Sequence, residues 1–297
     1  MQIALTLVGP DADIVAKTLD RLPEALAHSK VEMGEQRELG PGAVDILVER
    51  GDLSVVRRAV AGLVEGQAVD LCVQPAAGRR KALLIADMDS TIISCECIDE
   101  LADYAGVKAK VAEITERAMR GELDFEAALR ERVAMLRGLS VEVLQRAYNE
   151  RVRLNLGAAT LVKTMAAHGA PGFLVSGGFT FFTSRVMAAA GFTANRANEL
   201  GQAGGVLTGL VGSPILGREA KLQALKQEAA RLGVGLDAAL AVGDGANDLA
   251  MIEAAGLGVA YRAKPVVAAR ADAKVDHADL TALLYFQGYH RDQFVTE

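Results

Sequence analysis

Two carboxylates lie within residues 87 to 91, where Asp87 and Asp89 are followed by a serine and a threonine. The stretch directly follows residues 83 to 86, an apolar run typical of a buried strand. In open parallel sheets, ligands bind outside the carboxyl ends of the strands. Carboxylates at that place can act as a nucleophile, as a general acid and base, or as metal ligands, so the sequence predicts a catalytic site here.

A hydroxyl and two glycines, Ser176, Gly177 and Gly178, follow another apolar run. A hydroxyl with exposed amides before a helix can bind an anion, although most Ser-Gly-Gly runs are merely turns. Lys221 lies in a predicted helix further along the chain. A single helical lysine is usually a solvated surface charge, so neither feature indicates a site by itself.

A glycine-rich turn at residues 243 to 248 carries Asp244, Asn247 and Asp248 after a further apolar run. Hard oxygen ligands at this position suit Mg²⁺, although the turn alone could equally cap the helix that follows it. All of these groups lie at or near the carboxyl edge of one predicted sheet. Together they supply a nucleophile, a cation site and fixed donors for phosphate oxygens, which is what phosphoryl transfer needs.

Other kinds of site have little support in the sequence. The four histidines lack zinc-type spacing, and no Gly-x-Ser-x-Gly elbow is present. Cys95 and Cys97 stand one residue apart without a second pair, so a thiolate metal site is not expected. Three cysteines in a long chain also argue against a disulfide framework, and reduced thiols fit a cytoplasmic location.

Charge balance and apolar segments limit the partners of this 297-residue chain. With 38 acidic and 32 basic residues and a net charge of −6, it has no basic excess for nucleic-acid phosphates. No apolar stretch reaches the roughly 18 residues that a membrane span needs, and the start lacks the basic residues of a secretory signal. We therefore expect a cytoplasmic protein that binds neither nucleic acid nor a membrane.

The elements that position these groups are predicted to form two domains, residues 1 to 77 and residues 78 to 297. The first has apolar patterns in the order strand, helix, two strands, helix, strand, which is typical of a ferredoxin-like α+β sandwich. Its first helix is expected over residues 11 to 26. In the second domain strand-like and helical runs alternate, which predicts an α/β fold with a doubly wound parallel sheet.

A long interval, residues 92 to 171, separates the first strand of the second domain from the next one. It is rich in helix formers and exceeds what a single crossover helix needs. We interpret most of it, from about residue 95 to about residue 155, as an inserted helical cap that closes over the strand ends and excludes water. An enlarged packing layer is the alternative.

The motif residues resemble those of the haloacid dehalogenase-like phosphatases. The resemblance rests on four motifs, which are residues 87 to 91, residues 176 to 178, Lys221 and residues 243 to 248. Glu96 and the stretch from 118 to 133 further resemble the phosphoserine phosphatase family within that group. Residues 1 to 77 resemble ACT domains only in general character.

The resemblance implies a mechanism with Mg²⁺ as the cofactor. Asp87 would be the nucleophile that forms an aspartyl-phosphate, and Asp89 would be its acid and base partner. Burial and the proximity of Asp87 could raise the pKa of Asp89. The side chains of Asp87 and Asp244 and the main-chain carbonyl of Asp89 would hold the metal, which reduces the repulsion between nucleophile and phosphate.

The resemblance also implies a set of residues around the phosphate group, namely Ser176, the amide of Gly177, Gly178, Lys221, Asn247 and Asp248. The Ser176 hydroxyl, the Gly177 amide and the Lys221 ammonium would hold phosphate oxygens. Asn247 would contact the phosphate region, and Asp248 would orient Lys221 or metal-bound water.

The predicted cap supplies the groups that select the substrate. Glu96 and Arg132 offer opposite charges to the ammonium and carboxylate of a phosphorylated amino acid, although without the motifs they read more simply as a helix-surface ion pair. Phe125 and Met119 would supply apolar walls. The substrate that the resemblance implies is the small molecule phosphoserine, hydrolysed to serine and phosphate in the last step of serine biosynthesis.

Three alternatives stay open. A phosphotransferase that passes phosphate from phosphoserine to another alcohol, such as homoserine, would use the same residues. A phosphatase for another small phosphomonoester would share the core and differ in the cap. In a binding module, residues 1 to 77 would sense an amino acid or mediate dimerisation, and a homodimer is compatible with every one of these alternatives.

Overall fold

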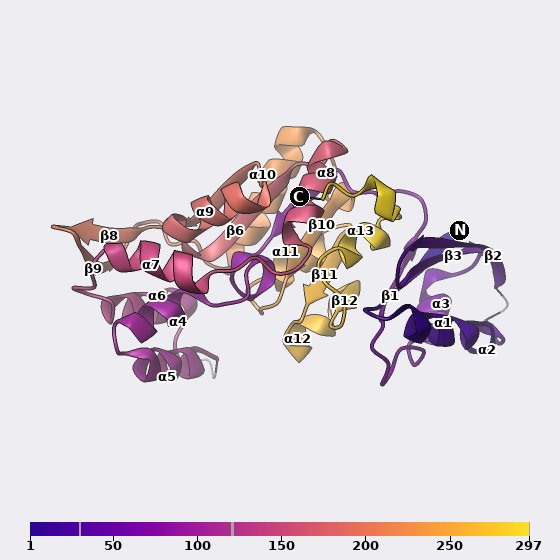
Figure 1. Ribbon diagram of the computed structural model, residues 1–297, viewed down its shortest axis with the longest axis horizontal. Coiled ribbons are helices and arrows are strands. Elements are labelled where there is room, and N and C mark those ends of the chain that lie inside the picture. Colours follow the sequence, from indigo (N-terminus) through magenta and orange to yellow (C-terminus); the bar gives the residue numbers. More distant parts are fainter. Residues whose placement is uncertain (30, 120–121, 297) are drawn as a thin grey trace.

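The computed structural model describes residues 1–29, 31–119 and 122–296, except for the side chains of residues 118 and 119. Figure 1 shows an elongated molecule with three parts. The N-terminal lobe lies at one end, a larger sheet with its helices lies in the middle, and a group of helices and a hairpin lies at the other end.

The N-terminal lobe is an antiparallel sheet with helices packed against it. Its strands, in the spatial order β2-β3-β1-β4, are β1 (Ile3–Val8), β2 (Glu32–Gly40), β3 (Ala43–Arg50) and β4 (Asp70–Pro75). Its helices are α1 (Ala12–Asp20), α2 (Leu22–Leu26) and α3 (Leu53–Val60). Leu5, Ile46 and Val56 belong to one core shared by strands and helices. The ferredoxin-like α+β arrangement predicted for this part is confirmed.

The single helix predicted over residues 11 to 26 is divided into α1 and α2. The first helix ends at Asp20, and Pro23 lies in the first turn of the second. A proline has no backbone N–H and therefore cannot make the hydrogen bond that continues a helix. It fits the first turn of a helix, because the N–H groups there have no partner within the helix. The break at Arg21 follows from this preference.

The central sheet is parallel throughout. Its strands are β5 (Leu83–Ala86), β6 (Gly172–Phe179), β7 (Ala194–Asn198), β10 (Ala239–Gly243), β11 (Leu257–Tyr261) and β12 (Ala273–Val275). They lie in the order β12-β11-β10-β5-β6-β7, so β5 is a central strand. Ala86 pairs with Leu174 on one side and Val242 on the other, which brings three strand ends to one edge.

Helices cover both faces of this sheet. One face packs on α8 (Ala158–Ala167), α9 (Thr180–Ala190) and α13 (Ala282–Phe286), and the other packs on α10 (Arg218–Leu232), α11 (Leu249–Ala254) and α12 (Pro265–Ala268). Alternation along β5 explains the two layers, because Leu84 belongs to one hydrophobic cluster and Leu83 and Ile85 belong to the other. The doubly wound α/β fold is confirmed.

The part of the molecule beyond the sheet edge is mainly helical. It contains α4 (Cys97–Tyr104), α5 (Lys108–Met119), α6 (Phe125–Ala134) and α7 (Glu142–Arg151). A hairpin of β8 (Leu200–Ala203) and β9 (Val206–Val211) packs on these helices, with Leu207 buried in the same cluster as Leu129 and Val133. The inserted cap predicted from the sequence is present, but this hairpin, which comes from a distant part of the chain, was not predicted.

Polar contacts join the N-terminal lobe to the central part. The buried Asp70 carboxylate accepts hydrogen bonds from the backbone N–H groups of residues 276–278, just after β12. The Gln74 amide donates to the carbonyl oxygen of Phe286 at 2.7 Å, and Arg79 pairs with Asp45 at 2.8 Å. Short 3₁₀ turns at Leu236–Ala238 and Arg291–Gln293 complete the described fold. Among the helices of the described residues, none has the length and apolar character needed to cross a membrane.

Candidate active site

Asp87 lies immediately after β5 and is only 5% exposed. Its backbone N–H donates to the carbonyl oxygen of Val242, and its carboxylate accepts the N–H of Met88 at 2.8 Å. The Lys221 ammonium lies 2.7 Å from the same carboxylate. Burial and the charge of Asp248 raise the pKa of Asp87 well above its usual value, while Lys221 opposes the rise. An ionised Asp87 therefore depends on nearby positive charge.

Asp89 turns toward the cap in a helical turn (Met88–Ile92) that is interrupted at Asp89 and Ser90. Its Oδ1 accepts the N–H of Cys97 at 2.9 Å, and its Oδ2 accepts the Ser176 hydroxyl at 3.1 Å. A Cβ on Gly178 would lie 2.7 Å from that Oδ2, so a side chain at this position would displace the Asp89 carboxylate. Burial raises the pKa of Asp89, which favours a carboxyl group that can hold and release a proton.

Lys221 and Asp248 form a buried pair behind Asp87. The Lys221 ammonium lies 2.6 Å from Asp248 Oδ1, and Asp248 Oδ2 accepts the backbone N–H groups of Asp244 and Gly245. Burial by itself would lower the pKa of Lys221, but the negative charges of Asp248 and Asp87 have the larger combined effect. The pKa of Lys221 is therefore raised, and the lysine stays charged. Asp248 thus fixes both the lysine and the turn that carries Asp244.

The carboxylates of Asp87, Asp244 and Asp248 offer oxygen atoms within 4.8 Å of one another. Asp244 accepts the Thr91 hydroxyl at 3.0 Å, and burial together with Asp248 raises the pKa of Asp244 to about 6. Both oxygens of Asp248 already contact Lys221 or backbone amides, whereas the hydrogen bonds and ion pairs of the Asp87 and Asp244 carboxylates among the described residues use only Oδ1, which leaves their Oδ2 atoms for a cation. Such a group of buried, mutually repelling hard oxygen donors fits Mg²⁺.

Ser176, Gly177 and Gly178 form the end of β6, and the Gly178 N–H donates to the Ser176 hydroxyl at 2.8 Å. Asn198, a buried residue at the end of β7, holds this segment. Its amide donates to the carbonyl oxygens of Gly177 at 2.8 Å and of Leu216 at 3.2 Å, and its Oδ1 accepts the Leu216 N–H. Asn198 was not singled out in the sequence, where a polar residue at a strand end was the only available signal.

Two charged residues of the cap face this cluster. Glu96 accepts the Ser90 hydroxyl at 2.6 Å, and burial and the charge of Asp89 raise the pKa of Glu96 to about 7. The Arg132 guanidinium donates to Thr115 Oγ1 at 3.5 Å and to a carbonyl of its own helix. Within the described part of the chain it forms no ion pair, so its charge faces the cleft without a carboxylate partner. Thr115 was not singled out in the sequence.

Most of these residues line one cleft of about 970 Å³ between the cap and the sheet edge. Its lining includes Asp87, Asp89, Glu96, Asp99, Thr115, Phe125, Arg132, Ser176, Gly177, Gly178, Asp244 and Asn247. Lys221 and Asp248 lie behind this wall. The side chain of Met119, predicted as an apolar wall, falls outside the described residues. The structure therefore brings together the other residues that the sequence analysis selected.

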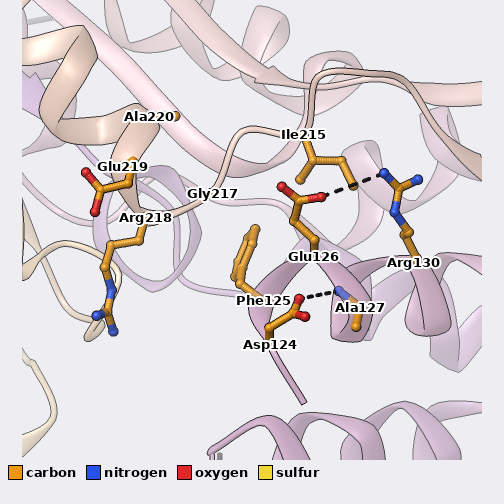
Figure 2. A pocket seen from close by; sticks show the side chains of 10 residues that line it. All are labelled: Asp124, Phe125, Glu126, Ala127, Arg130, Ile215, Gly217, Arg218, Glu219 and Ala220. Atoms are coloured by element: carbon orange, nitrogen blue, oxygen red, sulfur yellow. Dashed lines mark hydrogen bonds and ion pairs between the residues drawn. The ribbon is translucent and has the colours of Figure 1, made fainter.

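Phe125, the first residue of α6, separates this cleft from a second one of about 690 Å³. A Cβ on Gly177 or on Gly217 would lie 3.1 or 3.2 Å from the Phe125 ring, so the ring packs on both backbones. Figure 2 shows Phe125 between Arg218 on one side and the Glu126–Arg130 pair on the other. The ring supplies the predicted apolar wall and a contact between cap and core.

Comparisons with known proteins agree with this geometry. The model of the haloacid dehalogenase-like hydrolases matches residues 84–253. A phosphoserine phosphatase of Archaeoglobus fulgidus is 41% identical over 81% of this chain and 71% of the relative, and one of Polaromonas is 48% identical over 68% and 88%. The structure of a haloacid dehalogenase family hydrolase from Salmonella enterica serovar Typhi superposes with a TM-score of 0.86 at 29% identity, covering 98% of this chain and 99% of the other.

Proposed function

Since the chain belongs to the haloacid dehalogenase-like hydrolases, we propose that it is a Mg²⁺-dependent phosphoserine phosphatase, which hydrolyses O-phospho-L-serine to L-serine and phosphate. The observation that carries the proposal is that the core side and the cap side of one cleft offer different groups. The core half holds a buried carboxylate and lysine cluster suited to a phosphate group. The cap half presents Arg132 and Glu96, whose charges complement an amino acid.

The reaction begins with Asp87, which attacks phosphorus and forms an aspartyl-phosphate. Asp89 donates its proton to the departing serine oxygen. In the second half of the reaction Asp89 takes a proton from the water that hydrolyses the intermediate, which returns both residues to their starting states. The raised pKa of Asp89 supports its role as the acid, because a carboxyl group of ordinary pKa would hold no proton near neutral pH.

The phosphate group is held by donors from three segments. The Ser176 hydroxyl and the Gly177 amide come from the end of β6, Lys221 comes from α10, and Asn247 lies in the cleft wall beside Asp244. The carboxylates of Asp87 and Asp244, with the main-chain carbonyl of Asp89, would hold the Mg²⁺ ion. Mg²⁺ supplies positive charge that lowers the repulsion between a carboxylate nucleophile and a phosphate dianion.

The amino-acid end of the substrate is recognised by the cap. Arg132 receives the carboxylate, and its lack of an ion pair among the described residues leaves its donors available. Glu96 receives the ammonium of the substrate, and the positive charge of this ammonium favours the ionised form of the Glu96 side chain. By this reaction the protein would complete serine biosynthesis.

The proposal is tested by the release of inorganic phosphate from L-phosphoserine with Mg²⁺. Phosphothreonine, an aryl phosphate, a chelator and Asp87→Asn serve as comparisons. We expect metal-dependent release that prefers phosphoserine and is absent in Asp87→Asn. Release that favours another ester would keep the mechanism and reject the substrate, and the absence of release from every ester would reject the phosphatase itself.

A further inference from the structure

Arg218 is the first residue of α10, one helical turn before Lys221. Residues three apart lie on the same side of a helix, so Arg218 and Lys221 face the same way. Lys221 is buried, whereas Arg218 lies one turn closer to the start of the helix and is exposed. Its side chain is exposed and lines the active-site cleft. Its guanidinium forms no hydrogen bond or ion pair with the rest of the described chain, whereas nearby Arg130 pairs with Glu126 at 3.8 Å (Figure 2).

Lys264 lies on a different wall of the same cleft, in the segment that follows β11. Its backbone N–H donates to the carbonyl oxygen of Asp244 at 3.1 Å, which fixes its position beside the carboxylate cluster. Its ammonium is exposed and has no ion-pair partner among the residues that the structure describes.

The cleft that these two cations line also carries several carboxyl groups. Its wall carries Asp87, Asp89, Glu96, Asp99 and Asp244, and the whole chain has a net charge of −6. A phosphomonoester carries up to two negative charges near neutral pH, so ionised carboxylates repel it and exposed cations attract it. Charges within roughly 10 Å of one another interact at ordinary ionic strength, and exposed cations that line a cleft raise the local concentration of an approaching anion.

We propose that Arg218 and Lys264 form a cationic entrance, which attracts the phosphate group of the substrate and passes it to the site behind. The proposal rests on the phosphatase function proposed above and adds two residues to it. The two cations act on capture, not on the chemical step, because the groups that contact phosphorus and the leaving oxygen are Asp87 and Asp89. The ligand that this entrance recognises is a phosphate dianion, whether free or esterified.

The test is to reverse each charge, with Arg218→Glu and Lys264→Glu, and to measure phosphate release at low and at moderate ionic strength. We expect kcat/KM to fall about tenfold in each variant at low ionic strength, while kcat changes less than about twofold. The loss should shrink as salt is added, since salt screens exposed charges. Arg218→Lys, which keeps the charge, should behave as the unaltered protein.

The matched control is Lys226→Glu, an exposed residue of α10 that makes the same change in net charge. It lies about 12 Å further along the helix than Arg218 and outside the cleft lining, so kcat/KM should stay within about twofold. A loss of equal size in Lys226→Glu, a loss that salt does not change, or a fall confined to kcat would each overturn the cationic entrance.

Titration of the Mg²⁺-loaded protein with inorganic phosphate separates this proposal from the choice of substrate. Phosphate should bind about tenfold more weakly to Arg218→Glu and to Lys264→Glu than to the unaltered protein or Lys226→Glu. If phosphoserine is not hydrolysed but this pattern holds, the substrate proposal fails and the entrance stands. If all four proteins bind phosphate equally well, or none binds it, the entrance is rejected.

Discussion

At the scale of single residues, the proposed substrate recognition depends on Arg132, which has no ion-pair partner among the described residues of the cap. Arg132 is partly buried, and burial lowers its pKa, because a guanidinium loses hydration there. Asp99, Glu96 and Asp89 offset that cost at a distance. A buried charge that contacts only a hydroxyl and a carbonyl is better satisfied by an incoming carboxylate, and a planar guanidinium binds one through two hydrogen bonds.

We predict that Arg132→Ala lowers kcat/KM for phosphoserine about 100-fold, since two hydrogen bonds between charged groups contribute at least about 3 kcal/mol. The same variant should lose little activity on a small aryl phosphate, which has no carboxylate. Steady-state kinetics on both esters checks this. Arg130→Ala, on the same helix but lining the second cleft, is the control and should affect neither ester. Equal losses on both esters would contradict the assigned role.

The pH dependence should report Glu96, whose pKa is raised to about 7 in the substrate-free protein. Glu96 binds an ammonium only when it is ionised, so kcat/KM for phosphoserine should fall about tenfold per unit as the pH drops below about 7. An aryl phosphate lacks the ammonium and should show no such fall between about pH 6.5 and 8. Glu96→Gln should have lower kcat/KM for phosphoserine and a flat profile in that range. A profile unchanged by this substitution would assign the ionisation to another group.

At the scale of elements, the site depends on loops that are joined across strand ends. Asn198 connects the end of β6 to the segment that leads into α10, and thereby connects Ser176 and Gly177 to the helix that carries Lys221. Its side chain is 2% exposed, so its loss would leave buried backbone groups without partners. The consequence should appear both in stability and in phosphate binding.

We predict that Asn198→Ala lowers the free energy of unfolding by about 2 to 3 kcal/mol and weakens binding of inorganic phosphate several-fold. Urea unfolding and phosphate titration of the Mg²⁺-loaded protein measure the two effects. Asn195→Ala is a matched control on the same strand, because Asn195 contacts Thr183 and Met187 instead of the site loops. It should lose stability without losing phosphate affinity. Equal loss of affinity in both variants would show that Asn198 acts only through general stability.

At the scale of the whole molecule, the N-terminal lobe is attached to the central part by buried polar contacts, not by a loose linker. Asp70 receives three backbone N–H groups next to the edge strand β12. Arg79 pairs with Asp45 and lies against Gly288, where a Cβ would come within 2.6 Å of its guanidinium. The residues that line the active-site cleft all come from the part of the chain after residue 86. No described residue of the lobe lines this cleft, so any effect of the lobe on the site must pass through its contacts with the central part.

We predict that Asp70→Asn lowers the free energy of unfolding by about 2 kcal/mol, because one carboxylate oxygen that accepts N–H groups becomes an amide that cannot. Protease cleavage between β4 and β5 should become faster, while kcat on phosphoserine should stay within about twofold. Limited proteolysis and phosphate release measure these outcomes. Asp11→Asn, at an exposed helix N-cap where both residues serve equally, should change neither. A large fall in kcat for Asp70→Asn would mean that the lobe controls the active site.

Much of the site followed from the sequence alone, because the ends of neighbouring parallel strands must meet at one edge. Asp87, Ser176 and Asp244 each follow an apolar run, and the alternation of strands and helices placed those runs in one sheet. Local patterns therefore predicted the fold, the inserted cap and the meeting of these polar residues at one sheet edge. The residue identities around them resembled the motifs of the family to which the chain belongs.

Only the tertiary structure decided which distant segments support that cluster. The sequence pointed to Asn198 only as a polar residue at a strand end and did not point to Thr115 or the β8–β9 hairpin, since their roles arise from contacts across the fold. The same holds for Arg218 and Lys264. In a sequence they cannot be distinguished from other surface arginines and lysines, and only the structure shows that they line one cleft. The preferences of residues close together in the chain determine helices and strands. The contacts of a side chain depend on how those helices and strands pack against one another.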